Sequence, residues 1–175
     1  FTGLVAFLLM PDYLDTSTLA HFVFEFTIAC IFICHFVIDL EHHLLMDVLN
    51  LYLLGVVLLY VFFTYTWQYW VSGGLLGFGA PLAVTWIFYK IRGQVGLGGG
   101  DIKLFGILGL LFGPVGIMFN IFMSCFVGAL VGGSMIALGK LSKDRPMAFG
   151  PAILLVAAFQ FFFPNYSSIV QSWFF

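Results

Sequence analysis

Charged residues are scarce in this sequence: 8% of its 175 residues are Asp, Glu, Lys or Arg, whereas 62% are hydrophobic. A soluble globular domain carries about 25% charged residues, so this composition excludes an ordinary soluble domain. Apolar runs of roughly 17–25 residues, the length that crosses a lipid bilayer, recur along the chain. We therefore predict an all-α fold, a polytopic membrane helical bundle with about six to seven transmembrane segments.

Basic residues are few as well. The six Lys and Arg residues form no patch and the formal net charge is −2, so nothing in the sequence indicates a nucleic-acid partner. The sequence has neither a polar linker nor an internal repeat, and we expect residues 1–175 to form a single membrane-embedded domain. The chain begins with Phe1 rather than Met, and its first apolar run, 1–10, is too short to cross a bilayer. We therefore expect the sequence to be truncated at its N-terminus.

Cysteine is also rare, and no Cys or His pair completes a zinc-finger spacing. The three cysteines lie in apolar runs, where we expect them to be small buried side chains: Cys30, Cys34 and Cys125.

The apolar runs predict helices that are separated by short polar or glycine-rich breaks. Pro81 falls inside one run and predicts a kink, whereas Gly113-Pro114 ends another run. The predicted helices cover residues 19–38, 48–65, 73–91, 102–113, 115–138 and 149–163.

The basic residues predict the orientation of these helices. They fall into two clusters, within 90–103 and 140–145, and two predicted crossings separate the clusters. Both clusters can therefore lie on the cytoplasmic side, as the positive-inside rule expects. Counting crossings in the same way places Asp39, Asp47 and Asp101 together at the cytoplasmic face.

A glycine-rich stretch, Gly96-Leu97-Gly98-Gly99-Gly100-Asp101-Ile102-Lys103-Leu104, places a carboxylate and an ammonium group where an apolar helix begins. Acids beside membrane-spanning segments are costly and mark function. Asp39 and Asp101 are at the same predicted depth, where two neighbouring carboxylates titrate as a unit and one of them keeps a proton. The ionised one can then activate water while the neutral one polarises a carbonyl group, as in aspartic proteases. Gly98 and Gly100 would let a substrate backbone approach Asp101 without a collision between side chains.

Simpler interpretations of the same residues stay open. The glycine run can be a flexible connection, and Asp39 can follow a helix end and pair with His42 or His43. Asp47 can cap the helix that starts at the next residue, because Asp is a favoured capping residue. Lys103 can be a basic flank that fixes orientation, or its charge can hold Asp101 ionised or set the geometry of the loop.

A metal site at His42 and His43, beside two aspartates, is a further possibility, since imidazole and carboxylate groups are metal ligands. Adjacent histidines on one helix point in different directions, however, and the sequence has no His-Glu-x-x-His motif. We therefore predict no metal.

Three segments resemble the motifs of one known family. Gly98-Gly99-Gly100-Asp101 fits its Gly-x-Gly-Asp motif, and residues 101–104 fit the usual Asp-x-Lys-Leu continuation. Residues 38–47 resemble its Ile-Asp-x-x-His-x-x-Leu-Pro-Asp segment, and Phe149-Gly150-Pro151 resembles its Pro-Phe-Gly-Pro turn. In the order and spacing of these segments the chain resembles the bacterial type IV prepilin peptidases over nearly its whole length.

The resemblance implies a membrane aspartic endopeptidase of the bacterial inner membrane. It would cut the basic leader from type IV prepilins or type II secretion pseudopilins at the cytoplasmic face. The two catalytic aspartates of the family carry over to Asp39 and Asp101, Asp47 has a supporting role, and proteolysis needs no cofactor.

The chain also departs from the family. Met46 replaces the usual proline, Met147-Ala148 stands where Ile-Pro is common, and the earlier helix and Cys-x-x-Cys domain of bacterial members are missing. Many members also methylate the new N-terminus with S-adenosylmethionine, which applies here only if the full-length protein does so.

Two other functions are compatible with some of these residues. A small transporter could use Asp39 and Asp101 as proton or cation sites, but acids deeper in the helices and often an internal repeat would be expected. A non-catalytic scaffold for pilus or secretion assembly would not need two intact aspartates.

Overall fold

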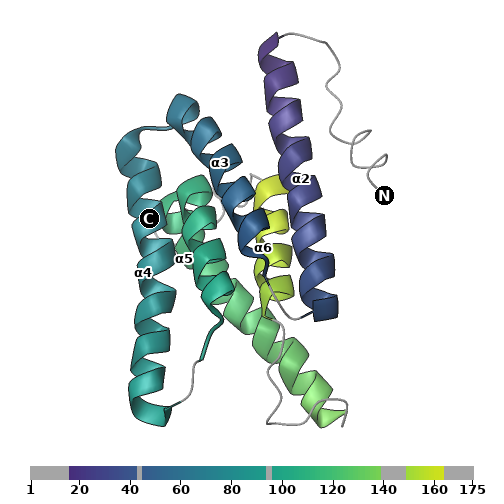
Figure 1. The fold of residues 1–175 in the computed structure, drawn as a ribbon, viewed down its shortest axis with the longest axis vertical. Helices are drawn as coiled ribbons and strands as arrows, with labels where there is room; N and C mark the ends of the chain where they lie inside the picture. Colours follow the sequence, from purple (N-terminus) through teal and green to yellow (C-terminus); the bar gives the residue numbers. More distant parts are fainter. Residues whose placement is uncertain (1–15, 43–44, 94–95, 139–148, 164–175) are drawn as a thin grey trace.

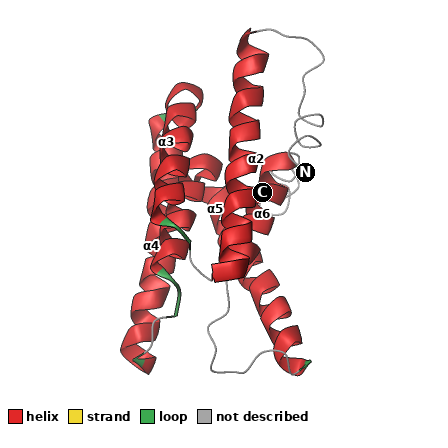
Figure 2. Cartoon of the chain, turned by 45° about the vertical axis from the view of Figure 1, so that its right-hand side comes forward, coloured by secondary structure: helices red, strands yellow, loops and turns green. Residues whose placement is uncertain are grey.

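The computed structural model describes residues 16–42, 45–93, 96–138 and 149–163, and all regular structure in these ranges is α-helical (Figures 1 and 2). The all-α membrane class is therefore confirmed. The described helices are α2 (Thr16–His42), α3 (Asp47–Thr64), α4 (Trp67–Arg92), α5 (Gly99–Ala137) and α6 (Gly150–Phe162).

Four of the described helices are long and apolar enough to cross a membrane, namely α2, α3, α4 and α5. Helix α6 has 13 residues and is too short to count. The expected six to seven transmembrane segments are thus not confirmed by helix length. The expected helix end at residues 1–10 lies outside the described residues.

By length and apolar composition α5 is a single candidate span, but its two halves run in opposite directions. Gly113 has φ 68° and ψ −175°, which is not helical, and Pro114 follows it. A Cβ atom at Gly77 would overlap the backbone of Phe105 and lie 3.0 Å from Cγ1 of Ile117. Those two residues would lie about 18 Å apart along a straight helix. The chain therefore doubles back at Gly113, where the sequence predicts a break, and Figure 1 shows the second half returning towards the level where α5 begins.

Glycines bring α4 and the first half of α5 into backbone contact. A Cβ atom at Gly73 would overlap the backbone of Gly109 and Gly113, which is the close approach that small residues permit between membrane helices. At the break in α5, Tyr69 donates a hydrogen bond from its hydroxyl group to the carbonyl oxygen of Phe112 at 2.7 Å. This bond satisfies a carbonyl group at the end of the first half of α5.

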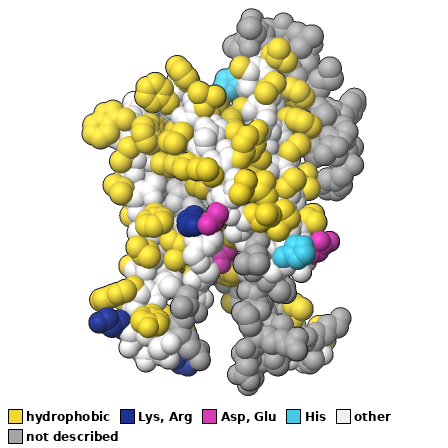
Figure 3. Space-filling view, in the orientation of Figure 1, with side chains coloured by type: hydrophobic (Ala, Val, Ile, Leu, Met, Phe, Trp, Pro, Cys, Tyr) yellow, Lys and Arg dark blue, Asp and Glu magenta, His cyan; other side chains and the backbone are white. Residues whose placement is uncertain are grey.

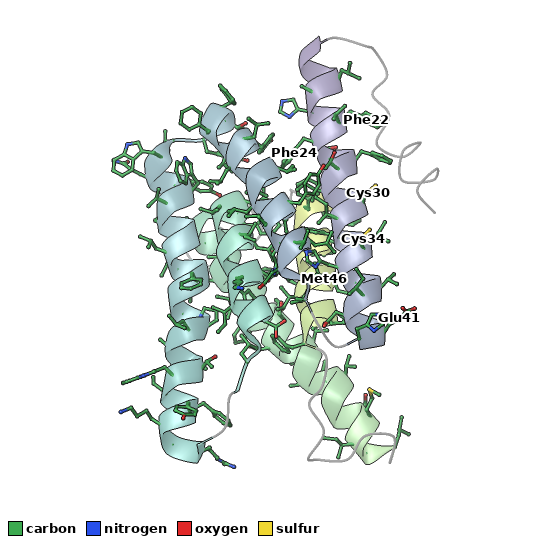
Figure 4. All side chains as sticks on the ribbon, viewed as in Figure 1. Phe22, Phe24, Cys30, Cys34, Glu41 and Met46 are labelled. Atoms are coloured by element: carbon green, nitrogen blue, oxygen red, sulfur yellow. The ribbon has the colours of Figure 1, made fainter. Side chains whose placement is uncertain are left out.

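The core lies where α2, α3, α5 and α6 meet. Its fully buried apolar side chains come from all four helices and include Ile28, Leu53, Leu108 and Ile153. Many large apolar side chains are exposed on the outside of the bundle, and Figure 3 shows them on one face. The prediction of buried cysteines is wrong, because Cys34 and Cys125 are exposed and Cys30 is only partly buried. Figure 4 shows Cys30 and Cys34 on the side of α2 that faces away from α3. An apolar residue in a membrane protein can face lipid as readily as the core.

All but one of the charged residues in the described ranges lie in the last four residues of α2 and α4 or the first five residues of α3 and α5, and we call this side of the bundle the charged end. Helices α2 and α4 finish on this side, whereas α3, α5 and α6 begin on it, and α4 extends further than α2 (Figure 1). Glu25, near the start of α2, is the exception within these ranges. Asp39, Asp47 and Asp101 thus share one end, as counting helix crossings predicts.

Candidate active site

Asp39 and Asp101 come together at the charged end from helices that are far apart in the sequence. Asp39 lies in the last turn of α2 and is only 4% exposed. Asp101 lies in the first turn of α5 and is partly buried. Both acids lie around Leu45: a Cβ atom at Gly150 would meet Asp39 and Leu45, and a Cβ atom at Gly100, next to Asp101, would also meet Leu45. The structure therefore unites the two residues that the sequence predicts to be catalytic.

The start of α5 determines how Asp101 is held. Gly98 is the N-cap, with φ −64° and ψ 145°, so Asp101 is the third residue of the helix. The backbone N–H of Gly98 donates a hydrogen bond to the Asp101 carboxylate. This is one half of a capping box, and the helix N-terminus also favours a negative charge. A Cβ atom at Gly98 would lie 3.0 Å from Oδ2 of Asp101, so a side chain there would crowd the carboxylate.

Gly100 lets the segment before α3 pack against this turn. A Cβ atom at Gly100 would lie 2.8 Å from Cβ of Leu45 and 3.2 Å from its carbonyl oxygen. Asn50 of α3 reaches the same turn, where its Nδ2 donates to the carbonyl oxygen of Gly100 at 3.5 Å. By contrast, nothing lies within 4 Å of a Cβ atom at Gly99. Gly98 and Gly100 thus each stand at a tight contact inside the protein, whereas their predicted role in admitting a substrate backbone stays a prediction.

Asp39 lies against the start of α6. A Cβ atom at Gly150 would overlap Oδ2 of Asp39, and it would lie 3.0 Å from Cγ of Asp39 and 3.4 Å from Cδ1 of Leu45. Gly150 is the first residue of α6, with Phe149 as its N-cap and Pro151 in the first turn. The positive end of the α6 dipole thus lies beside the Asp39 carboxylate. Each aspartate of the pair is therefore next to a helix N-terminus.

Gly150 was not among the predicted site residues. The sequence did contain a signal for it, since Phe149-Gly150-Pro151 matches a motif of the family that the chain resembles. That match gave no role to the glycine, because the role depends on contact between α2 and α6.

Asp47 and Lys103 form an ion pair at the edge of the site. Lys103 Nζ lies 2.7 Å from Oδ1 of Asp47, and the side chains are 51% and 70% exposed respectively. The capping role expected for Asp47 is wrong: the N-cap of α3 is Met46, and Asp47 is the first helical residue. The carboxylate of Asp47 turns to Lys103 instead, which connects the start of α3 to the start of α5.

The residues considered for a metal site are only partly described. His42 and Glu41 are exposed at the end of α2, with Nε2 of His42 3.9 Å from Oε2 of Glu41, and Figure 4 shows Glu41 pointing away from the bundle. His43 lies outside the described residues. Among the residues that the structure describes, no group of three or more His, Cys, Asp and Glu side chains is arranged to hold a metal ion.

Residues that the structure describes line two apolar grooves on the bundle. One, of about 690 Å³, lies between α3, α4 and α5. Its polar lining is Asp47, Asn50 and Lys103 at the charged end, and it continues along Leu54 and Leu110. The other, of about 580 Å³, lies between α2 and α6 and has an apolar lining. The larger groove thus joins an apolar wall to the edge of the candidate site.

Comparison with known proteins identifies the family. The profile of the type IV leader peptidase family matches residues 26–133, which is more than half of the chain and includes both aspartates. The chain belongs to the type IV leader peptidase family. The expected resemblance to bacterial type IV prepilin peptidases is thereby confirmed.

Relatives in this family are named prepilin leader peptidase/N-methyltransferase. The protein from Stutzerimonas stutzeri is 33% identical over 120 residues, which is 67% of this chain and 42% of the relative. The protein from Xanthomonas campestris pv. campestris is 31% identical over 140 residues, or 79% of this chain and 49% of the relative. The one from Bacillus subtilis is 39% identical over 80 residues, or 46% of this chain and 32% of the relative. The chain thus spans less than half the length of these relatives. No solved structure matches it.

Proposed function

We propose that this chain is the peptidase part of a type IV prepilin leader peptidase, with Asp39 and Asp101 as its catalytic pair. Its substrates would be type IV prepilins or type II secretion pseudopilins, from which it removes the basic leader. The observation that carries the proposal is the placement of these two acids around Leu45 in an apolar bundle, each beside a helix N-terminus. The names of the relatives supply the substrate class. Since both acids lie at helix ends, the transporter alternative gains no support.

The chemistry proposed is that of an aspartic peptidase. Two neighbouring carboxyl groups do not both ionise readily, so the pair holds one proton. The ionised carboxylate takes a proton from a water molecule as the water oxygen attacks the scissile carbonyl carbon. The protonated carboxyl group gives its proton to the carbonyl oxygen. When the C–N bond breaks, the acid that took the proton from water gives it to the leaving amine. The other carboxylate takes a proton from a hydroxyl group of the tetrahedral intermediate, so the pair again holds one proton.

The orientation follows from the charged end. Lys90, Arg92 and Lys103 of the described residues lie there, so the positive-inside rule favours the cytoplasmic side of the inner membrane for this end. If each half of α5 is counted separately and α6 is included, six helical segments alternate in direction. In this arrangement the aspartates meet water at the membrane surface, and the adjoining groove offers an apolar surface to a hydrophobic substrate segment.

We assign no methyl-transfer step to the described residues. S-adenosylmethionine requires several polar partners for its base, its ribose and its charged groups. The groove between α2 and α6 is lined by apolar residues, and the larger groove has three polar side chains, two of which bind each other. The described grooves therefore do not fit this cofactor.

The proposal is tested by reconstituting the chain in lipid vesicles with a prepilin that carries a basic leader. We expect cleavage at the end of the leader, measured by a mobility shift and by mass spectrometry of the new N-terminus. We expect EDTA to leave the rate unchanged, because two carboxyl groups suffice for the chemistry. No cleavage by the inserted wild-type chain would reject the proposal. Inhibition by EDTA with recovery on adding zinc would favour the metal site considered at His42 and His43.

Crowding the glycine turn provides the next prediction. We expect Gly98→Val and Gly100→Val each to lower kcat by roughly 10²-fold, because the added side chain displaces Asp101 or the segment at Leu45, and small displacements are that costly. Gly99→Val is the matched control, since a Cβ atom there meets nothing within 4 Å. Cleavage by all three variants is measured in the vesicle assay, with the inserted amount quantified. Wild-type turnover by Gly98→Val and Gly100→Val would show that the turn is only a linker.

Breaking the Asp47–Lys103 ion pair should have a smaller effect. We expect Asp47→Asn to lower cleavage less than Asp101→Asn does, and to change the free energy of unfolding by about 0–1 kcal/mol, the range for exposed ion pairs. Thermal unfolding in detergent and the cleavage rate measure the two effects. Complete loss of activity in Asp47→Asn would move this residue into the catalytic set.

A further inference from the structure

Three polar side chains are buried inside the bundle, away from the candidate active site. Asn120 and Ser124 lie in the second half of α5, and Gln160 lies near the end of α6. They are 0%, 0% and 2% exposed respectively. Polar groups inside a membrane bundle are costly unless they bond to one another, so this cluster needs an explanation.

The three side chains bond to one another and to the backbone. Asn120 donates from Nδ2 to Oε1 of Gln160 at 2.6 Å, and Gln160 donates from Nε2 to the carbonyl oxygen of Gly116 at 2.9 Å. Ser124 donates from Oγ to Oδ1 of Asn120 at 3.3 Å. Because Gln160 accepts from one residue of α5 and donates to another, these bonds set both the height and the rotation of α6 against α5.

Helix α6 has one polar side chain and one glycine. Gln160 contacts α5, and Gly150, ten residues earlier, contacts Asp39 on α2. Ten residues rotate a helix by about 1000°, which is about 80° short of three full turns, so the two residues face neighbouring helices. The other side chains of α6 are apolar. Apolar packing gives a membrane helix little preference between registers, because lipid is as apolar as the neighbouring helices.

The register of α6 decides what touches Asp39. A slip by one residue moves the helix by about 1.5 Å and rotates it by about 100°. The backbone of Gly150 would then leave Asp39, and Phe149 or Pro151 would approach it with a side chain. A Cβ atom at position 150 already overlaps the carboxylate, so the site has no room for either neighbour.

We propose that Asn120 and Gln160 are positioning residues that lock the register of α6 and thereby hold Gly150 against Asp39. The expected effect on catalysis rests on the proposed peptidase function. The register of α6 on α2 can be measured without any activity assay.

Disulfide cross-linking measures the register directly. Cysteines are placed at Asp39→Cys and Gly150→Cys after the three native cysteines have been replaced by alanine. The Cβ atom at position 150 lies 3.0 Å from the Cγ position of residue 39, where the cysteine sulfur would be. This separation suits a disulfide, with an S–S bond of about 2.05 Å and Cβ atoms about 3.5–4.5 Å apart. We expect rapid oxidation with this pair and slower oxidation with Asp39→Cys and Pro151→Cys.

The hydrogen bond between Asn120 and Gln160 is then removed with apolar side chains of similar size, in the double variant Asn120→Leu/Gln160→Met (the Leu/Met variant). Replacing both partners removes the amide pair together. The Ser124 hydroxyl group loses Asn120 Oδ1 as acceptor, but a helical serine can donate to the carbonyl oxygen four residues earlier, so the helices still pack and thermal stability should be retained. We expect oxidation at positions 39 and 150 to slow severalfold and oxidation at 39 and 151 to rise. Ser134→Ala is the control, since it removes a hydrogen bond within α5 alone, from Oγ to the carbonyl oxygen of Val131. Unchanged cross-linking in the Leu/Met variant would overturn the proposal.

Activity provides the second measurement, with residues 39 and 150 left native. We expect the Leu/Met variant to lower kcat roughly tenfold or more with little change in KM, because the apolar groove is retained while Asp39 is misplaced. The exchange Asn120→Gln with Gln160→Asn should restore part of the rate. A wild-type kcat in the Leu/Met variant would overturn the positioning role. If the wild-type chain fails to cleave prepilin but cross-linking responds as expected, the register lock stands and the peptidase function is rejected.

Discussion

Replacing either acid of the pair with its amide, Asp39→Asn or Asp101→Asn, is expected to abolish cleavage of a prepilin while the protein still inserts in the membrane. One carboxylate must take a proton from water and the other must give a proton to the carbonyl oxygen, and an amide does neither. General acid–base catalysis contributes roughly 10²–10⁴-fold to a rate, so each variant should lose at least that factor in kcat. Asn has almost the volume of Asp, and the packing around Asp39 should therefore survive.

The measurement is the initial rate of cleavage in vesicles, normalised to inserted protein. The double variant Asp39→Asn/Asp101→Asn should be no slower than either single variant, because residues that act as a unit are not additive. Glu41→Gln is the matched control: it changes an acid two residues from Asp39, but its side chain is 68% exposed and points away from the bundle. A rate near that of wild type for Asp101→Asn would reject the aspartic-peptidase mechanism. A loss of activity in Glu41→Gln equal to that in Asp39→Asn would assign the effect to net charge at this end.

Much of this site follows from local features of the sequence. The break at Gly113-Pro114 can be predicted from these two residues alone, because a proline after a glycine interrupts the hydrogen bonds of a helix. In the structure Gly113 has a positive φ and the chain reverses there. Asp39 and Asp101 fall on one side of the bundle for a separate local reason, since two crossings, α3 and α4, lie between them. The number of spans was less predictable, because a count by helix length merges the two halves of α5 and omits α6.

Residues whose roles depend on a long-range contact were assigned less well. Asp47 has the local signature of a capping residue, but an ammonium group 56 positions away binds its carboxylate. The roles of Gly150 and Gln160 require the packing of α6 against both α2 and α5. Composition and motif spacing do not specify that packing, since nearly every residue of α6 is apolar.

The contact between Gly150 and Asp39 yields the second large effect. We expect Gly150→Val to lower kcat by 10²-fold or more and Gly150→Ala to have a smaller effect in the same direction. Any Cβ atom at this position overlaps the Asp39 carboxylate, so Asp39 or the start of α6 must move, and displacements of about 1 Å cost roughly 10²-fold. The variants are compared with wild type in the vesicle cleavage assay, with thermal unfolding in detergent measured in parallel.

The comparison of activity with stability separates this effect from ordinary damage to the fold. Alanine is a better helix former than glycine by roughly 0.5–1 kcal/mol, so Gly150→Ala gains some free energy of unfolding from the backbone. The same change displaces the Asp39 carboxylate or the start of α6. Activity should therefore fall by a much larger factor than stability alone would explain. Gly79→Ala is the control for a helical glycine, because a Cβ atom there meets nothing within 4 Å, and it should leave cleavage unchanged. If Gly150→Val cleaves as fast as Gly79→Ala, α6 does not shape the environment of Asp39, and the catalytic geometry must be set by α2 and α5 alone.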